Sequence, residues 1–397
     1  MLYISLGMSS LEKRAIVLNA VFNLSSTLSS LFLNVYLFVY AKSLPLMCVY
    51  TIIRISLFPL FFIVGSKLVK KYPYSLTYSL GLILIAGSLL YALLGTSLFE
   101  INSKYILIAA VMTGIGEGFY WFSANTCNQL VSNIENRASF LAFSGIFNNI
   151  ASLAAPIIAN IIIINSSSDM SAYRIIITII FILYIIVAII SLPIRIKSEK
   201  SISSLKNSFN FKDKMWRDHC VAVVLYGLRN SLTLVLTGLL IYNAVQSGNL
   251  YSRLQSVFAL ITIIVFYLLT KKKDKTKIKT DFIFGVVVAI LSVSVLVIFN
   301  NIYGAIFFGV TNALCTCYYD NSYNYLSANI ISNYMDDMVE RVVARETCLS
   351  IGRCLGMGII VLFYFILPDN LYLKISVISL SLSSIFVYKL LINYKKN

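Results

Sequence analysis

Apolar residues occur along the chain in long blocks separated by short polar stretches. A bilayer core roughly 30 Å thick needs about 20 helical residues to cross, and most blocks have about that length. Membrane β-strands instead alternate apolar and polar residues over about ten positions, a pattern that this chain lacks. The blocks therefore predict twelve membrane-spanning helices. The expected spans are residues 15–41, 47–66, 74–95, 104–126, 139–164, 173–194, 218–243, 251–270, 282–299, 302–326, 346–367 and 371–392.

Composition and charge agree with a membrane location. Apolar residues make up 59% of the chain and charged residues 12%, against about 45–50% and about 25% in soluble proteins. The net charge of +16 comes from basic residues between the apolar blocks. There it sets orientation in the membrane, so we expect no nucleic-acid partner. The distribution predicts that both termini lie in the cytoplasm. The frequent use of isoleucine, asparagine and lysine is typical of a low-GC bacterium, so the expected location is a bacterial cell membrane. Basic residues at expected outer positions are few: Lys42, Lys104, Arg174, Arg253 and Lys374.

The longest polar stretch, residues 195–216, divides six expected spans from six. We therefore expect an all-α membrane protein made of an N-terminal six-helix half (residues 1–194), a cytoplasmic linker (residues 195–216) and a C-terminal six-helix half (residues 217–397). A second basic inner loop, residues 271–279, either binds anionic lipid headgroups or is a solvated loop that ends a span.

Charged side chains inside the spans are the strongest functional signal. Near the bilayer centre such a side chain costs about 2.5–3.5 kcal/mol, so it should face protein or water. Glu117 and Asp320 are candidates for proton coupling, because a buried carboxyl group can load a proton. Arg54, Arg229 and Arg353 would bind an anionic group of the substrate or tune those carboxylates. The alternative for all five is a structural ion pair.

Neutral polar and aromatic residues extend this candidate site. Polar residues three or four positions apart lie on one face of a helix, and several such faces can surround an aqueous cavity. Each is alternatively a hydrogen-bonding contact between helices. Tyr120, Trp121 and Tyr319 would supply stacking surface. The substrate-binding candidates also include Asn34, Asn125 and Asn148. The faces comprise Asn19, Asn23, Thr27, Ser30 and Asn34; Thr113, Glu117, Trp121 and Asn125; Ser144, Asn148, Ser152 and Asn160; Arg229, Thr233 and Thr237; and Asn312, Thr316, Asp320 and Asn324.

The sequence contains no enzyme motif that we can identify. It has no P-loop, no G-x-S-x-G and no H-E-x-x-H. His219 is the only histidine and is expected at the inner membrane edge. The seven cysteines lack zinc-ligand spacing and are interpreted as packing residues. We therefore expect neither catalysis nor a metal or other cofactor.

Three segments of the chain are typical of one transporter family. They are Phe32–Tyr36, Gly116–Trp121 and Gly227–Asn230. With twelve spans, a six-plus-six division and a long central inner loop, the chain resembles the Major Facilitator Superfamily, and especially its bacterial drug-exporter-like branch. The resemblance implies a central cavity lined by spans one, two, four, five, seven, eight, ten and eleven, on which all five charges fall.

Two family motifs are present only in part. In the loop after the second span, Gly65 and Lys70 match, whereas Val69 and Tyr72 replace the family's aspartate and second glycine. The antiport motif of the fifth span keeps its proline and small residues, which favours export over import and permits close helix packing. Its positions hold Ala142, Ala151, Ala155, Pro156, Ala159 and Asn160.

These observations predict a secondary active transporter working by alternating access. Two halves rock about a site near the membrane midplane, and proton flow drives export of a small amphipathic molecule. We expect it to be a monomer whose partners are that molecule, the coupling proton and membrane lipids. The alternatives are an importer of an anionic solute, a non-transporting sensor or assembly protein, and a lipid flippase.

Overall fold

The computed structural model describes residues 9–69, 71–131, 137–194, 209, 211–271, 278–299, 301–334, 338–368 and 371–392. Every regular element in these ranges is helical. The chain divides into two compact units. Unit 1 comprises Met1–Ser43 and Ser56–Ile202, and unit 2 comprises Leu44–Ile55 and Ser203–Asn397. Most of the expected linker, residues 195–216, lies outside the described residues, as does Lys70 of the loop motif.

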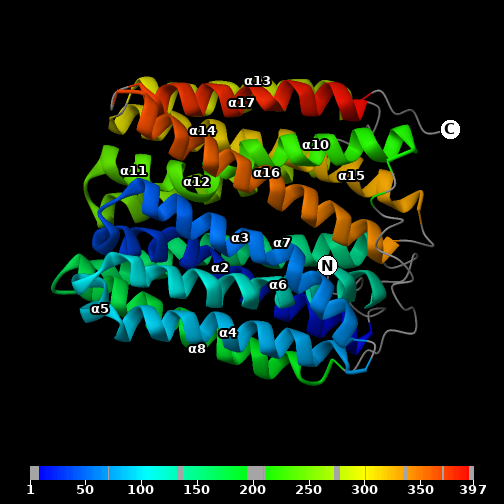
Figure 1. Cartoon of the computed structure of the whole chain (residues 1–397), viewed down its shortest axis with the longest axis horizontal. Coiled ribbons are helices and arrows are strands. Elements are labelled where there is room, and N and C mark those ends of the chain that lie inside the picture. The colour runs from blue at the N-terminus through cyan, green and yellow to red at the C-terminus, as the bar shows by residue number, and fades with distance from the viewer. Residues whose placement is uncertain are drawn as a thin grey trace. The chain divides into compact units, whose positions relative to one another are not determined.

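Unit 1 consists mainly of long antiparallel helices, and α2, α4, α6 and α8 lie alongside one another (Figure 1). Hydrogen bonds between Ser9 and Glu12 form a capping box that starts the first of them. The elements are α2 (Ser10–Ala41), α3 (Leu44–Leu68), of which residues 44–55 group with unit 2, α4 (Tyr74–Leu94), α5 (Thr96–Ile101), the 3₁₀ turn η1 (Ser103–Tyr105), α6 (Ile106–Val131), α7 (Arg137–Ile164) and α8 (Asp169–Ser191). Pro59 and Pro156 lie inside α3 and α7, which continue through them.

In unit 2, α10, α13, α16 and α17 pack around a shared apolar core (Figure 1). Two of its long helices contain a π-helical segment, η2 and η4. The elements are α10 (Lys214–Ser231), η2 (Leu232–Leu236), α11 (Thr237–Val245), α12 (Gly248–Lys271), α13 (Ile278–Ile298), α14 (Ile302–Cys315), η4 (Thr316–Asp320), α15 (Asn321–Ser332), α16 (Met338–Ile366) and α17 (Tyr372–Ile392).

The all-α membrane fold predicted from the sequence is confirmed. In the described part, 11 helices are long and apolar enough to cross a membrane. The remaining expected span, residues 218–243, corresponds to α10, η2 and α11 in series.

Helix α16 begins at Met338, whereas the apolar pattern placed the span's start at residue 346. The helix starts earlier than the apolar pattern predicted because other side chains bury the charged residues of its first turns. The guanidinium of Arg341 lies 4.5 Å from the Trp216 ring centroid and 4.2 Å from that of Tyr334. Cation–π contacts of this kind compensate for the loss of water around an arginine.

Glycines allow the backbones of neighbouring helices to approach closely. In unit 1, a Cβ atom added to Gly116 would lie 2.6 Å from the carbonyl oxygen of Gly81, so α4 and α6 meet backbone to backbone. In unit 2, a Cβ at Gly227 of α10 would lie 2.6 Å from the carbonyl oxygen of Leu349 of α16. Close contact through small residues replaces the hydrophobic effect as the force that associates helices in lipid.

We expect Gly227→Ala to destabilise unit 2 by about 1–3 kcal/mol, because the added methyl group meets backbone atoms that can yield only if the helices separate. The measurement is the melting temperature of the purified protein in detergent. Gly358→Ala on α16 is the matched control, since nothing lies within 4 Å of its added Cβ. Equal melting temperatures for the two variants would contradict the assigned helix contact.

The start of α10 is fixed by Asp213, which accepts hydrogen bonds from the backbone N–H groups of Met215 and Trp216. The Tyr334 hydroxyl also donates to this carboxylate. Burial alone would raise the pKa of Asp213. The hydrogen bonds from Tyr334 and the backbone, together with the nearby charge of Arg341, instead hold the pKa below its usual value.

Folding lowers the pKa of Asp213, so its ionised form stabilises the protein above the ordinary carboxyl pKa, and this stabilisation is lost as the pH falls through the folded-state pKa. We expect Asp213→Asn to melt at a lower temperature than the wild type near neutral pH. The difference should shrink progressively in acid. A difference that does not vary with pH would exclude this role for the carboxylate.

Candidate functional site

A buried ion pair lies within unit 2, in the middle of two long helices. Arg229, near the end of α10, places Nη1 3.3 Å from Oδ1 of Asp320, the last residue of η4. The Arg229 side chain is 3% exposed and that of Asp320 is 24% exposed. The Tyr226 hydroxyl donates to the same carboxylate oxygen over 3.1 Å. Two groups predicted separately from the sequence are therefore direct partners.

The surroundings of Arg229 hold its guanidinium in place. The central guanidinium carbon, Cζ, lies 4.7 Å from the ring centroid of Tyr319. Nη2 donates to the Cys315 sulfur over 2.6 Å. The Nε atom of Arg229 is buried without a hydrogen-bond partner in the described part of the chain. Tyr319 has 0% exposure. It contacts Arg229 rather than presenting an open stacking surface.

Both helices that form the ion pair contain a π-helical segment next to it. η2 begins three residues after Arg229, and η4 ends at Asp320. A π-turn contains one more residue than an α-turn, and such turns are frequent at functional sites. The sequence-based prediction that polar residues share one helix face assumed a regular period of 3.6 residues. The π-helical segments break this period, so the expected faces through Thr233 and Thr237 and through Thr316 do not continue unchanged across them.

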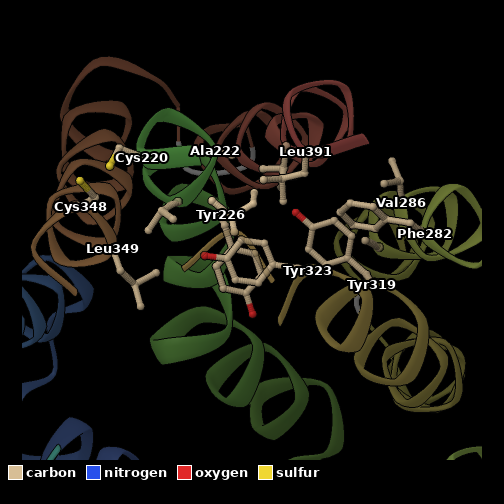
Figure 2. Close-up of a cluster of buried hydrophobic side chains, with 14 of the residues drawn as sticks. Cys220, Ala222, Tyr226, Phe282, Val286, Tyr319, Tyr323, Cys348, Leu349 and Leu391 are labelled. Atoms are coloured by element: carbon tan, nitrogen blue, oxygen red, sulfur yellow. The ribbon is translucent and has the colours of Figure 1, made fainter. Parts of the chain in front are cut away.

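Three tyrosines, Tyr226, Tyr319 and Tyr323, lie together in the buried core of unit 2 (Figure 2). The rings of Tyr226 and Tyr323 are nearly parallel, with centroids 3.7 Å apart and an interplanar angle of 5°. The rings of Tyr226 and Tyr319 also stack, with a centroid distance of 5.9 Å. Because Tyr226 is packed against both, the position of the hydroxyl that meets Asp320 is tightly fixed.

Arg353 of α16 is a second cationic centre in unit 2. Its Nε donates to Oδ1 of Asn230 over 2.8 Å, and it lies close enough to Arg54 of α3 for the two like charges to interact. Glu346, also within electrostatic range of Arg353, is paired with Arg345 at 2.7 Å. Among the described residues, Arg353 has no carboxylate at ion-pairing distance.

In unit 1, the predicted aromatic residues form part of a packed cluster. The ring of Tyr120 on α6 stacks on Phe22 of α2 with centroids 3.5 Å apart. Trp121 meets the edge of Phe22 at 5.4 Å and is 37% exposed, whereas Tyr120 is 1% exposed. Asn125 follows one turn later on α6 and is half-buried. The accessible aromatic surface of this cluster is therefore that of Trp121.

Glu117 is buried on α6 between two glycines that contact different helices. Gly116 meets α4 at Gly81, and Gly118 meets α3 at Phe61. Glycine on both sides thus allows two helices to pack tightly around this carboxyl group.

The polar faces of α2 and α7 are joined by hydrogen bonds. Asn23 Nδ2 donates to the backbone carbonyl of Asn148 over 2.7 Å and to Oγ of Ser152 over 2.8 Å. Asn19 similarly donates to Asn128 of α6 over 3.1 Å. These contacts hold helices together, as the alternative interpretation anticipated. Asn34, towards the end of α2, is half-buried.

Several residues of the site were not predicted from the sequence. Tyr226 and Tyr323 lie three positions from Arg229 and Asp320, so each shares a helix face with one member of the pair. Arg345 and Glu346 were placed at the edge of a span, yet the Glu346 side chain is only 9% exposed. Helical spacing from the recognised charges could have identified the tyrosines. The contact partner of Glu346 required the three-dimensional packing.

The described residues form apolar helices long enough to cross a membrane, with the pair of Arg229 and Asp320 in the interior of unit 2. A family model for the Major Facilitator Superfamily matches residues 15–357. The chain therefore belongs to the Major Facilitator Superfamily, a superfamily of secondary transporters, and is a transporter rather than an enzyme.

Two proteins that carry no assigned function are similar to this chain in sequence. The chain is 22% identical over 379 residues to the uncharacterized protein YqgE of Bacillus subtilis (strain 168), covering 94% of this chain and 87% of that protein. It is 30% identical over 140 residues to an uncharacterized protein in the sodM 3' region of Geobacillus stearothermophilus, covering 35% of this chain and 64% of that protein.

Solved structures of transporters share the fold. The nucleoside transporter NupG gives a TM-score of 0.68 at 12% identity, covering 98% of this chain and 100% of that chain. The E. coli Fucose:proton symporter FucP gives 0.65 at 14% identity, with the same coverage. A bacterial homologue of the iron transporter ferroportin, in its inward-facing state, gives 0.67 at 11% identity, covering 96% and 98%.

The ion pair makes a double-mutant prediction. Asp320→Asn leaves the Arg229 charge buried without a partner, and we expect it to destabilise the protein by about 3–5 kcal/mol. Arg229→Gln combined with Asp320→Asn removes both charges and should recover most of the lost melting temperature. The four proteins of this cycle are compared by thermal unfolding in detergent. Additive effects of the two single substitutions would show that the residues are not energetically coupled.

Proposed function

We propose that the protein is a proton-coupled secondary transporter that exports a small amphipathic molecule by alternating access. The observation that carries this proposal is the Asp320 carboxylate, which has a buried arginine on one side, a tyrosine hydroxyl beside it and a partly exposed surface. A carboxylate so arranged can gain or lose a proton while its partners stay ordered.

Protonation of Asp320 would change the forces on the two π-containing helices. With the carboxylate ionised, Arg229 binds it and joins α10 to η4. With the carboxyl group neutral, the attraction is lost and Arg229 remains charged in a low-dielectric environment. A shift in helix position or the binding of another anionic group would then lower the free energy. Proton binding is thereby linked to conformation, as a coupled carrier requires.

In this proposal, the two halves predicted from the sequence, residues 1–194 and 217–397, rock about a midplane site in the bacterial cell membrane. Both termini lie in the cytoplasm, the protein acts as a monomer and lipids surround it. The proposed proton-coupling carboxyl groups are Glu117 of unit 1 and Asp320 of unit 2. The proposed substrate-binding residues are those with exposed surface, Asn34, Arg54, Trp121, Asn125, Asn148 and Arg353. Tyr120, Arg229 and Tyr319, which the sequence also predicted, are buried against other side chains and are not part of the proposed binding surface. The fold shared with a fucose:proton symporter is compatible with proton coupling.

Import of an anionic solute is the second candidate, and the cationic centre at Arg353 favours it. In the described part of the chain, Arg353 is hydrogen-bonded to a neutral amide, close to a second arginine, while Glu346 is already paired with Arg345. A carboxylate or phosphate on a substrate would neutralise this centre. Direction of flux in inverted membrane vesicles separates import from export.

We expect Asp320→Asn and Glu117→Gln each to abolish substrate movement driven by an imposed proton gradient in proteoliposomes. Substrate exchange without a gradient should persist, because it does not need net proton transfer. The assay uses a panel of small amphipathic dyes, such as ethidium, and measures their gradient-dependent accumulation. Asp169→Asn, at an exposed helix start, is the matched control and should transport normally. Full coupled transport by either test variant would remove that residue from the coupling role.

A further inference from the structure

The guanidinium of Arg229 is divided between two partners on the helix that contains η4. Its Nη1 lies 3.3 Å from Oδ1 of Asp320, and its Nη2 donates to the Cys315 sulfur over 2.6 Å. The exposed fractions of Arg229 and Cys315 are 2% and 0%, so the contact between them is shielded from water. The two terminal nitrogens that one carboxylate could bind together are therefore occupied by different side chains.

The π-turn of η4 places these two partners on one face of the helix. The Asn321 N–H donates to the backbone carbonyl of Thr316, five residues earlier, which is the hydrogen bond that defines a π-turn. Cys315 and Asp320 are also five residues apart. In a regular α-helix they would lie about 140° from each other around the axis, and the extra residue of the π-turn reduces this angle to about 40°. Both side chains can then reach one guanidinium.

Helix α13 supports the widened turn from another side. A Cβ atom added to Gly285 would lie 2.5 Å from the backbone nitrogen of Tyr319 and 2.7 Å from its Cα. The glycine therefore lets α13 pack directly on the backbone of η4, while the Tyr319 ring lies 4.7 Å from Cζ of Arg229. The position of Cys315 relative to Asp320 is thus held by both Arg229 and the backbone of α13.

The carboxylate of Asp320 is bound through one of its two oxygens. Nη1 of Arg229 and the Tyr226 hydroxyl both contact Oδ1, whereas Oδ2 receives no hydrogen bond from the described residues. Oδ2 is therefore the oxygen that is left to bind a proton. An arginine with both terminal nitrogens available would bind both carboxylate oxygens, the stronger arrangement for such a pair. By occupying Nη2, the Cys315 thiol prevents that arrangement.

We propose that Cys315 is a positioning residue for proton exchange at Asp320. Its thiol holds Nη2 of Arg229, so the ion pair uses one carboxylate oxygen and the other stays open to protonation. This inference rests on the proton coupling proposed above for Asp320 and adds a residue to it. The other titratable groups within electrostatic range of Asp320 are Tyr226 of α10 and, on its own helix, Cys317 and Tyr319.

The test measures protonation of Asp320 by infrared spectroscopy of the full-length protein in proteoliposomes over a pH titration. The carboxylic-acid band that is missing in Asp320→Asn is assigned to Asp320. In Cys315→Ala, Nη2 of Arg229 is free to bind Oδ2 and stabilises the ionised carboxylate. A higher proton concentration is then needed, so the midpoint of the band should move to a lower pH by about one unit, the size expected for one further hydrogen bond to a charged group.

A conservative variant and a matched control distinguish positioning from packing. The hydroxyl oxygen of Cys315→Ser can still accept from Nη2, so this variant should keep the wild-type midpoint. Cys317→Ala should also keep it, because the Cys317 thiol donates to the carbonyl oxygen of Thr262 instead. Cys315→Val fills the space of the thiol without an acceptor and should shift the midpoint like Cys315→Ala, so the test does not depend on one variant folding.

Three results would overturn the proposal. They are a wild-type midpoint in Cys315→Ala and Cys315→Val, an equal shift in Cys315→Ser, and the absence of an Asp320 band from the wild type at every pH.

Two readouts separate this inference from the coupling role of Asp320. If Cys315→Ala shifts the midpoint of the Asp320 band while Asp320→Asn keeps gradient-driven dye transport, the positioning role stands and coupling at Asp320 fails. If Asp320→Asn abolishes coupled transport and Cys315→Ala keeps the wild-type midpoint, coupling at Asp320 stands and the positioning role fails.

Discussion

The energetic cost of placing charge inside a membrane governs how unit 2 is built. An arginine in that environment must be compensated, and Arg229 is surrounded by a carboxylate, a thiol and an aromatic face. These partners come from the long helix that contains η4, so compensation also fixes how that helix packs against α10. The need to compensate the buried charge of Arg229 therefore determines which side chains surround it. Removing the charge of Asp320 would leave the buried guanidinium of Arg229 without its carboxylate partner.

Close backbone contact provides the complementary constraint. Gly227 of α10 faces Leu349 and Gly352 of α16, and Gly116 faces Gly81 in unit 1. Such contacts leave no space for side chains between the helices, so polar groups on either side are held at a defined separation. The Arg353–Asn230 hydrogen bond lies beside the Gly227–Gly352 contact, because Arg353 follows Gly352 directly and Asn230 comes three residues after Gly227. Tight packing and polar pairing therefore occur together along this interface.

The sequence predicted the all-α membrane fold and the charged residues inside it. Both the length of an apolar segment and a charged residue within it can be recognised from the sequence without knowledge of the packing. It could not show that Arg229 pairs with Asp320, since contact between distant segments depends on packing. Glu346 was missed for a related reason. Its span is charged at the start, and the partners that bury Arg341 and Arg345 come from other parts of the chain or from an adjacent residue. His219 was expected at the membrane edge, but its full burial depends on α15 packing over it.

Because of the two π-helical segments, the number of residues in each of these helices affects which side chains meet as much as the residue types do. Each segment adds a residue to a turn, so the helix beyond it is rotated by about 100° relative to a continuous α-helix. Deleting one residue from η2 or η4 would let the turn relax to α-geometry and rotate everything that follows. The rotation would carry neighbouring side chains away from their present partners without altering any of them. Homologues that differ only by such a deletion could keep every charged residue and still present a different lining to the molecule that they carry.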